Sequence, residues 1–300
     1  MCRRALFVFD WLKLTEATLV FIEKKSVVCD EMIFIIDRAD ELPFCGDLIT
    51  KLQSLFSKRL NKPFYLLPMF CKGLPNHYYW MRWRFLAPLF QIVYTDQVDN
   101  RSLLHTVLHT PVEVFESRQD TLFLNVNECL PVKKRGLFIT RAQPFHLGHV
   151  ALLNAMKHDV DELIFLVAMA NQSHTINNIA TSGERLEMCL PWLNEVWPGR
   201  YFLVALPYSD FSMENFFELE FLLPKFDKVH TSNPDVAVLA ESAGFTTQFY
   251  PIQNIIRGSF IRDCFRRNLP FEEYVPESTS QLLTRAKIPE RFRALFAMEK

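Results

Sequence analysis

The sequence lacks an excess of charge of either sign. It holds 33 lysines and arginines against 34 aspartates and glutamates, and its formal net charge is −1. Such a chain has no overall attraction for nucleic acid or for an anionic membrane surface. We therefore expect neither as a partner, and binding partners have to be inferred from local sites.

A long hydrophobic run is also absent. No stretch offers the roughly 20 apolar residues that span a bilayer. The apolar amino terminus is interrupted at Asp10, Lys13 and Glu16 before it reaches the length of a signal peptide. We expect a soluble, cytoplasmic protein.

Cysteines are few and irregularly placed. There are seven, an odd number without even spacing, which suits a reducing compartment better than a disulfide framework. Cys129 and Cys189 are isolated, and no third and fourth ligand stands at a zinc-site spacing. We expect reduced cysteines and no metal site built from protein ligands.

What the chain does have is apolar content and length. It has 300 residues, of which 49% are hydrophobic and 28 are phenylalanine, as expected for a well-buried globular protein. This length is enough for two domains, each with its own core.

The two halves contain an internal repeat. Arg4–Val8 aligns with Arg135–Ile139, and Asp30–Ile36 aligns with Asp161–Val167, both with a shift of 131 positions. These apolar runs have the length of buried strands, and helical patterns alternate with them, which predicts a parallel sheet covered on both faces.

We therefore predict an α/β fold with two doubly wound, Rossmann-like parallel-sheet domains in tandem. The predicted domains are residues 1–130 and 131–300, divided near the polar segment 125–134, which contains Pro131. The alternative, that the first half is an unrelated domain, stays open.

A turn in the second half points to chemistry. After the strand-like run Gly136–Ile139, His146, Gly148 and His149 lie where a helical pattern begins. Backbone N–H groups at a helix start favour phosphate, neutral imidazoles donate to its oxygens, and glycine leaves room for a ligand. The alternatives for this turn are helix caps or a metal site.

The stretch from Thr140 to His149, TRAQPFHLGH, resembles the GRFQPxHxGH signature of the nucleotidyltransferase superfamily in its archaeal-type nicotinamide-nucleotide adenylyltransferase form. Ser173–Met188 is similar to the family's SHTxxNPFTxGERxEM segment, with Ile179 and Ala180 in place of Pro-Phe. Val229–Asn233 is similar to its TGN turn, and Ile256–Arg262 to its ISxTxIR signature, with Arg257 in place of serine. The resemblance covers about residues 135–290.

The resemblance assigns roles to residues of the second half. The implied catalytic residues are His146 and His149, which hold the transferring phosphate, and Arg185 and Arg262, which hold the pyrophosphate. The residues implied to bind ATP and its phosphates are Arg141, Gln143, Pro144, Phe145, Gly148, Asn233, Gly258 and Ser259. Those implied to bind the nicotinamide nucleotide are Ser173, His174, Thr175, Asn177, Phe216 and Phe217, the last two standing where a tryptophan is expected.

In the first half, Thr15–Thr18 stands opposite His146–His149, and Lys13 stands opposite Pro144. Because neither imidazole nor glycine remains there, we expect the first domain to be a degenerate, non-catalytic nucleotidyltransferase-like copy. Its expected work is packing, oligomer assembly or regulation, so a homo-oligomer is possible.

The resemblance implies direct transfer of the adenylyl group of ATP to nicotinamide mononucleotide, giving NAD and pyrophosphate. Mg²⁺ is expected as a cofactor bound through the substrate phosphates. One alternative is an adenylyl or cytidylyltransferase for another acceptor, such as nicotinic acid mononucleotide, FMN or pantetheine phosphate. The other is a regulator that senses NAD or ATP without turnover.

Overall fold

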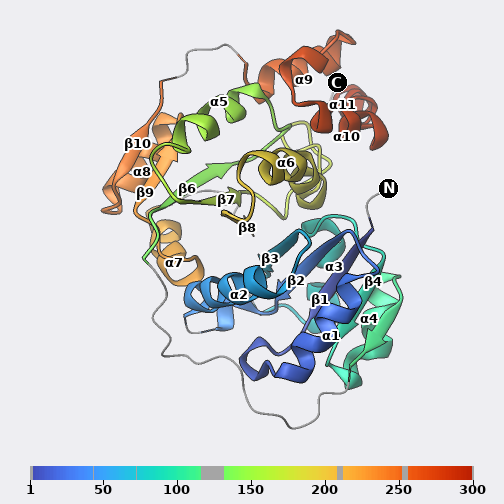
Figure 1. Ribbon diagram of the computed structural model, residues 1–300. Helices are drawn as coiled ribbons and strands as arrows, with labels where there is room; N and C mark the ends of the chain where they lie inside the picture. The colour runs from blue at the N-terminus through green and yellow to red at the C-terminus, as the bar shows by residue number, and fades with distance from the viewer. Residues whose placement is uncertain are drawn as a thin grey trace. The chain divides into compact units, whose positions relative to one another are not determined.

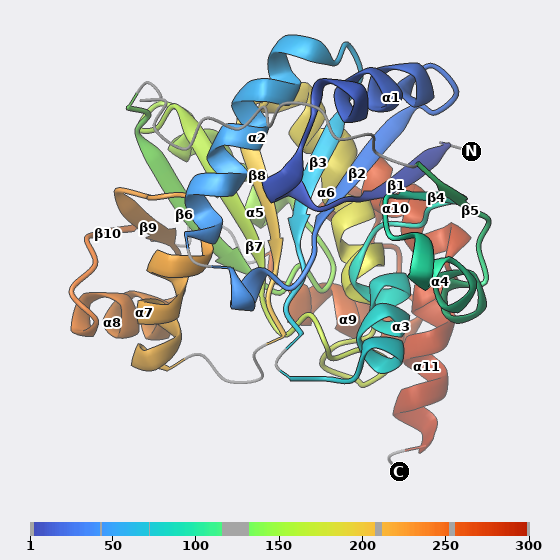
Figure 2. The same ribbon diagram turned by 90° about the horizontal axis from the view of Figure 1, so that it is seen from below.

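The computed structural model describes residues 3–42, 44–71, 73–115, 132–207, 212–251 and 256–298. By its internal contacts the chain divides into two compact units (Figures 1 and 2). The first unit comprises Met1–Val132 with Leu219–Lys225, and the second comprises Lys133–Glu218 with Phe226–Lys300. Residues 125–131 of the predicted boundary lie outside the described residues.

The first unit is a five-stranded parallel sheet in the order β3-β2-β1-β4-β5. Its strands are β1 (Arg4–Val8), β2 (Glu31–Ile36), β3 (Phe64–Pro68), β4 (Ile92–Thr95) and β5 (Val112–Val114). Its α-helices are α1 (Glu16–Ser26), α2 (Cys45–Arg59), α3 (Asn76–Leu86) and α4 (Arg101–Leu108), with short 3-10 helices η1 (Trp11–Lys13), η2 (Ala39–Glu41) and η3 (Val98–Asn100).

The sheet of the second unit is also parallel and has the order β10-β9-β6-β7-β8. Its strands are β6 (Arg135–Thr140), β7 (Glu162–Val167), β8 (Tyr201–Ala205), β9 (Lys228–Thr231) and β10 (Thr247–Phe249). Its helices are α5 (Leu147–Met156), α6 (Ser182–Val196), α7 (Met213–Leu222), α8 (Pro234–Ser242) and α9 (Gly258–Arg267), then η4 (Glu272–Tyr274), α10 (Glu277–Arg285) and α11 (Ile288–Met298). The division between the units passes through α7.

The central strands are apolar along their whole length because helices cover both faces of each sheet. Every residue of β1 is buried, as is every residue of β2 after Glu31. The same holds for β7 after Glu162. Strands buried on both faces read as continuous Val, Ile, Leu and Phe runs, so the predicted α/β fold class with two parallel-sheet domains is confirmed.

The two sheets match in order and in detail. Counted from the strand that opens each unit, their strand orders are the same. At the start of that strand, Arg4 is paired with Glu31 (Nε to Oε2, 2.5 Å), and Arg135 is paired with Glu162 (Nε to Oε2, 2.7 Å). These ion pairs are 131 positions apart, as the repeat in the sequence predicts.

The backbone repeats as well after the second strand of each unit. Arg38 follows β2 with φ of 47°, and Met169 follows β7 with φ of 54°. Non-glycine residues seldom adopt this left-handed conformation. Its presence at equivalent positions indicates that the duplication extends to individual turns.

Three C-terminal helices complete the second unit beside α6 (Figure 1, upper right). Thr279, Leu282 and Leu283 of α10 are buried, and the hydroxyl group of Thr279 donates to the carbonyl oxygen of Met188 on α6 (3.3 Å). α11 packs against α9. These helices give α6 a second packed side.

Over the ranges that the structure describes, no helix combines the length and the apolar character that crossing a membrane requires.

Candidate functional site

The site is built around the turn that joins β6 to α5. His146 is the N-cap residue of α5, and its backbone N–H donates to Nδ1 of His149 in the first helical turn (3.2 Å). The two imidazole rings stack with their centroids 3.8 Å apart. The turn therefore fixes the two histidines against each other.

His149 is held on several sides. The ring of Phe145 lies parallel to it, at an interplanar angle of 2° and a centroid distance of 5.5 Å, and Phe138 meets it edge to face. Its Nε2 lies 2.9 Å from Oγ1 of Thr140, the last residue of β6. Burial, and then the neighbouring His146, hold the pKa of His149 well below its ordinary 6.5. The ring is therefore neutral at pH 7.

His146 is 7% exposed, and its Nδ1 is buried without a hydrogen-bond partner among the described residues. Burial, and then the positive charge of Arg262, lower the pKa of His146 from 6.5 to about 4. A buried polar atom without a partner costs about 1–3 kcal/mol. His146 is therefore a neutral imidazole with unused hydrogen-bonding capacity.

Both histidines open onto a cavity of about 830 Å³ within the second unit. The cavity lies beyond the carboxyl ends of β6, β7 and β9, where open α/β sheets bind their ligands. Its lining residues are Phe138, Ile139, Thr140, Arg141, Ala142, Gln143, Pro144, His146, His149, Ala168, Met169, Thr231, Ser232, Asn233, Pro234, Asp235, Val236, Leu239, Arg257, Gly258, Ser259 and Arg262.

The charge of the lining is positive. In the described part of the chain it holds the three arginines Arg141, Arg257 and Arg262 and one carboxylate, Asp235. Burial, and then the charge of Arg141, lower the pKa of Arg262. None of these arginines forms an ion pair with another described residue, so the cavity presents uncompensated positive charge.

Helix ends add to this field. The N-cap residues of α5, α8 and α9, which are His146, Asn233 and Arg257, all line the cavity. The N-terminal ends of helices carry partial positive charge and unpaired N–H groups. Together with the arginines, they make the cavity suited to an anion with several phosphates.

Close backbone contacts hold α9 against the β6–α5 turn. Nη1 of Arg262 donates to the carbonyl oxygen of Gln143 (2.9 Å). A Cβ on Gly258 would lie 2.9 Å from that same oxygen. Glycine at position 258 therefore allows the approach that brings Arg262 to the cavity.

Comparisons with known proteins agree with this geometry. Residues 137–201 match the model of the Cytidylyltransferase-like family. The nicotinamide-nucleotide adenylyltransferase of Thermococcus onnurineus is 35% identical over 165 residues, which cover 54% of this chain and 88% of that protein. The protein of the same name from Saccharolobus solfataricus is 32% identical over 170 residues, covering 55% of this chain and 99% of that protein.

The chain belongs to the nicotinamide-nucleotide adenylyltransferase family. The resemblance found in the sequence is thus confirmed. Among solved structures, a bifunctional NMN adenylyltransferase/ADP ribose pyrophosphatase from Francisella tularensis aligns with a TM-score of 0.48 and 13% identity, covering 54% of this chain and 53% of that one.

Many of the residues that the adenylyltransferase signatures single out do meet at the cavity. These are Arg141, Gln143, Pro144, His146, His149, Asn233, Gly258, Ser259 and Arg262. Gln143 contributes its backbone there, because its side-chain amide pairs in both directions with the backbone of Ala180 (3.0 and 3.1 Å).

Arg185 corrects one expectation from the adenylyltransferase signatures. It is fully buried, and its five N–H groups all donate to backbone carbonyl oxygens, at distances of 2.9–3.4 Å. The acceptors are the carbonyl groups of Arg141, Ala168, Met169, Gln172 and Thr181. Burial lowers the pKa of Arg185 from 12.5 to about 10. No donor is left for a phosphate, so the predicted pyrophosphate contact is wrong and the residue instead joins two loops.

Two further residues of the HxGH turn act differently from the expectation. Phe145 is fully buried beneath His149 and does not reach the lining. Gly148 makes room for the protein itself, because a Cβ there would lie 2.7 Å from the carbonyl oxygen of Ile256 and 2.9 Å from the ring of His146. Both residues position the histidines, and neither reaches the ligand space.

The structure does not bring the residues predicted for the nicotinamide nucleotide to this cavity. Ser173, His174, Thr175 and Asn177 lie in the loop before α6, outside the lining. Phe216 has no exposed surface and packs against Phe245, so the prediction that it stacks on a ligand ring is wrong. Phe217 is 48% exposed, also outside the lining.

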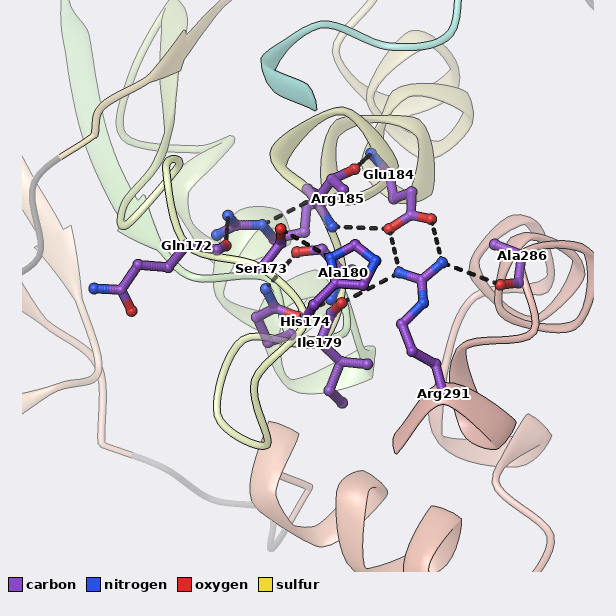
Figure 3. A network of polar contacts seen from close by, with 11 residues as sticks. Gln172, Ser173, His174, Ile179, Ala180, Glu184, Arg185, Ala286 and Arg291 are labelled. Carbon is purple, nitrogen blue, oxygen red and sulfur yellow. Dashed lines mark hydrogen bonds and ion pairs between the residues drawn. The ribbon is translucent and has the colours of Figure 1, made fainter. Parts of the chain in front are cut away.

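Glu184 and Arg291 form a contact that sequence reasoning missed. The predicted capping box of α6 is present: Thr181 accepts from the Glu184 N–H, and Glu184 accepts from the Thr181 N–H. The same carboxylate is clamped by Arg291 of α11, which also donates to the carbonyl groups of Ile179 and Ala286 (Figure 3).

Thr140, Met169, Arg257, Ser232 and Asp235 also line the cavity and were not predicted. Arg257 and Thr140 each replace a residue of the family signature, serine and glycine respectively. Such departures within a matched motif were the available signal.

The equivalent place in the first unit is filled. Thr15 caps α1 and its Oγ1 lies 3.0 Å from that of Thr18, so two threonines stand where the second unit has two histidines. Trp11 is buried there, and its Nε1 donates to the carbonyl oxygen of Ile35.

Proposed function

We propose that this chain transfers the adenylyl group of ATP to nicotinamide mononucleotide, giving NAD and pyrophosphate. The observation that carries the proposal is the pair of neutral, stacked histidines beside three arginines in one cavity. Curated relatives that bear the name of this activity support it.

In the proposed reaction a phosphate oxygen of the mononucleotide attacks the α-phosphorus of ATP. The bond from that phosphorus to the bridging oxygen breaks, and pyrophosphate leaves. No protein nucleophile takes part, so the protein aligns two anions and stabilises the charge that develops between them.

His146 is assigned to the transferring phosphate. Its Nδ1 is turned toward Gly148, which leaves Nε2 to donate a proton into the cavity. Because its pKa is lowered to about 4, the ring stays neutral across physiological pH and serves as a hydrogen-bond donor without gaining charge.

Arg262 is assigned to the leaving pyrophosphate, with Ser259 and the N–H groups at the start of α9. One N–H of Arg262 is fixed on the Gln143 carbonyl group, which orients the guanidinium before any ligand arrives. Arg141 and Arg257 add positive charge at the same cavity.

The cavity fits a divalent cation carried by phosphates better than one held by a protein cage. Its described lining contains one carboxylate, Asp235, and the described residues include no group of three His, Cys, Asp or Glu side chains placed to bind a metal. When bound, Mg²⁺ would neutralise phosphate charge, held by phosphate oxygens and water.

The test is release of pyrophosphate from ATP with Mg²⁺, with nicotinamide mononucleotide, nicotinic acid mononucleotide, FMN and pantetheine phosphate supplied separately. Release with the nicotinamide nucleotide supports the proposal. Release with FMN or pantetheine phosphate alone would assign another acceptor. Calorimetric binding of ATP or NAD without any turnover would favour a sensor.

The variant His146→Ala is expected to lose roughly 10²–10³ in kcat with the fold retained. The matched control is His158→Ala, an exposed histidine of the same unit outside the cavity lining. Full activity of His146→Ala would remove this residue from the mechanism.

We also infer that the domain of residues 1–130 is a degenerate nucleotidyltransferase-like copy and that residues 131–300 form the catalytic domain. The support is the matching topology together with Trp11, Thr15 and Thr18 in place of the site. Calorimetry is expected to find one ATP per chain, and a second ATP that survives His146→Ala would contradict the inference.

A further inference from the structure

The hydroxyl group of Thr140 lies at the centre of a small hydrogen-bond system at the end of β6. Its Oγ1 is 2.9 Å from Nε2 of His149 and accepts the backbone N–H of Ala142 (3.0 Å). Thr140 is 8% exposed and lines the cavity.

The direction of these hydrogen bonds follows from the state of His149. Its Nδ1 accepts the backbone N–H of His146, so Nδ1 carries no proton. The ring is neutral because its surroundings lower its pKa, and a neutral imidazole carries one proton. That proton is therefore on Nε2, which donates to Oγ1 of Thr140.

Thr140 then has one proton left to give. A hydroxyl oxygen accepts two hydrogen bonds and donates one, and both acceptor positions are taken, by His149 and Ala142. Within the described ranges no acceptor receives the Thr140 proton. The direction that remains is set by its neighbours, and the residue borders the cavity.

We propose that the Thr140 hydroxyl group donates to a ligand phosphate oxygen, and that His149 is a positioning residue that acts through Thr140. The proposal rests on the proposed phosphate site. It gives His149 a different part from that of His146: one ring orients the donor, and the other is a donor itself.

This arrangement is particular to the present chain. The signature GRFQPxHxGH has glycine at the position of Thr140, and glycine supplies no hydroxyl group. In the first unit the equivalent residue is Phe9, which is buried and apolar. Neither alternative residue would stand between the second histidine and a phosphate.

The first experiment compares Thr140→Val with Thr140→Ser. Valine keeps the branched shape and removes the hydroxyl group, so kcat is expected to fall roughly 10²–10³-fold, the effect of losing one transition-state donor. Serine keeps the hydroxyl group and should stay close to wild-type kcat. The control is Thr95→Val, at the end of β4 in the first unit, which should leave turnover unchanged. Wild-type turnover of Thr140→Val would overturn the proposal.

The second experiment is the double variant Thr140→Val with His149→Ala. Because His149 acts through Thr140, the double variant is expected to lose no more kcat than the worse single variant. Losses that multiply would show two independent donors and would overturn the positioning role.

The third experiment needs neither turnover nor a variant. ¹⁵N NMR of labelled histidine is expected to show His149 protonated at Nε2 and not at Nδ1. The Nε2–H resonance should hold its position when ATP is added, because it remains on Thr140. A large shift on ATP binding would mean direct contact between His149 and phosphate. A chain that binds ATP without turnover would refute the transferase proposal and still decide this one.

Discussion

Arg291 and Glu184 are joined by two parallel hydrogen bonds, Nη1 to Oε2 and Nη2 to Oε1, each 2.9 Å long, across 107 residues of sequence. Burial acts to raise the pKa of Glu184, but the hydrogen bonds of Arg291 and Thr181 outweigh it and leave the pKa below its ordinary value. The pair fastens α11 to the start of α6 and to the loop that ends at Ile179.

Arg291→Lys should therefore loosen that loop. Lysine keeps the charge but cannot form the paired contact or hold the Ile179 carbonyl group at the same time. We expect hydrogen exchange of the Ala180 amide to speed up about tenfold, which corresponds to ~1.4 kcal/mol. Glu290→Gln, on the exposed side of α11, is the control. Unchanged exchange in Arg291→Lys would show that the loop is held by other contacts.

Arg185→Lys should destabilise the second unit. Lysine has three N–H donors against five for arginine, so two of the buried carbonyl groups lose their partner. At about 1–3 kcal/mol for each unsatisfied group, the free energy of unfolding is expected to fall by roughly 2–4 kcal/mol. Denaturant unfolding measures it. Unchanged stability with a raised KM for ATP would instead support the phosphate contact predicted from the sequence.

Gly148→Ala should impair the site and leave the fold intact. Alanine usually favours a helix over glycine by about 1 kcal/mol, but here its Cβ would press on the His146 ring and on the Ile256 carbonyl oxygen. We expect kcat to fall at least about tenfold, on the scale of one displaced transition-state donor. Circular dichroism checks the fold, and normal turnover would contradict the predicted clash.

Stability should fall as the pH drops below 6.5. His146 has its pKa lowered to about 4 and His149 well below 6.5, whereas both titrate near 6.5 in the unfolded chain. Between 6.5 and the lower folded values the unfolded state binds protons that the folded state refuses. Each histidine then removes up to about 1.4 kcal/mol per pH unit. Unfolding measured at pH 7.5, 6.0 and 5.5 should give a shallower slope for His146→Asn, and an equal slope would be evidence against the buried, neutral ring.

Local patterns predicted the fold and the centre of the site well. Continuous apolar runs predicted the parallel strands, and the shift of 131 positions predicted the matching halves. The spacing of Thr181 and Glu184 predicted a capping box. His146, His149 and Arg262 reach one cavity because each lies at the start of a helix that follows a strand or loop at the same edge of the sheet.

Contacts that depend on distant partners could not be predicted. Arg185 is engaged by backbone carbonyl groups, which every residue type possesses and no motif displays. Glu184 meets Arg291 only because α11 folds back beside α6. Phe216 could have faced either a ligand or the core, and its burial against Phe245 depends on tertiary packing that composition does not encode.

The duplicated sheet amounts to a natural experiment carried within one polypeptide. Features kept in both copies, such as the ion pairs Arg4–Glu31 and Arg135–Glu162 and the left-handed residues Arg38 and Met169, are demands of the architecture. Features that differ are demands of the chemistry, above all threonine at 15 and 18 against histidine at 146 and 149. Each substitution in the second copy therefore has a ready-made reference in the first, where the same backbone has been released from the reaction.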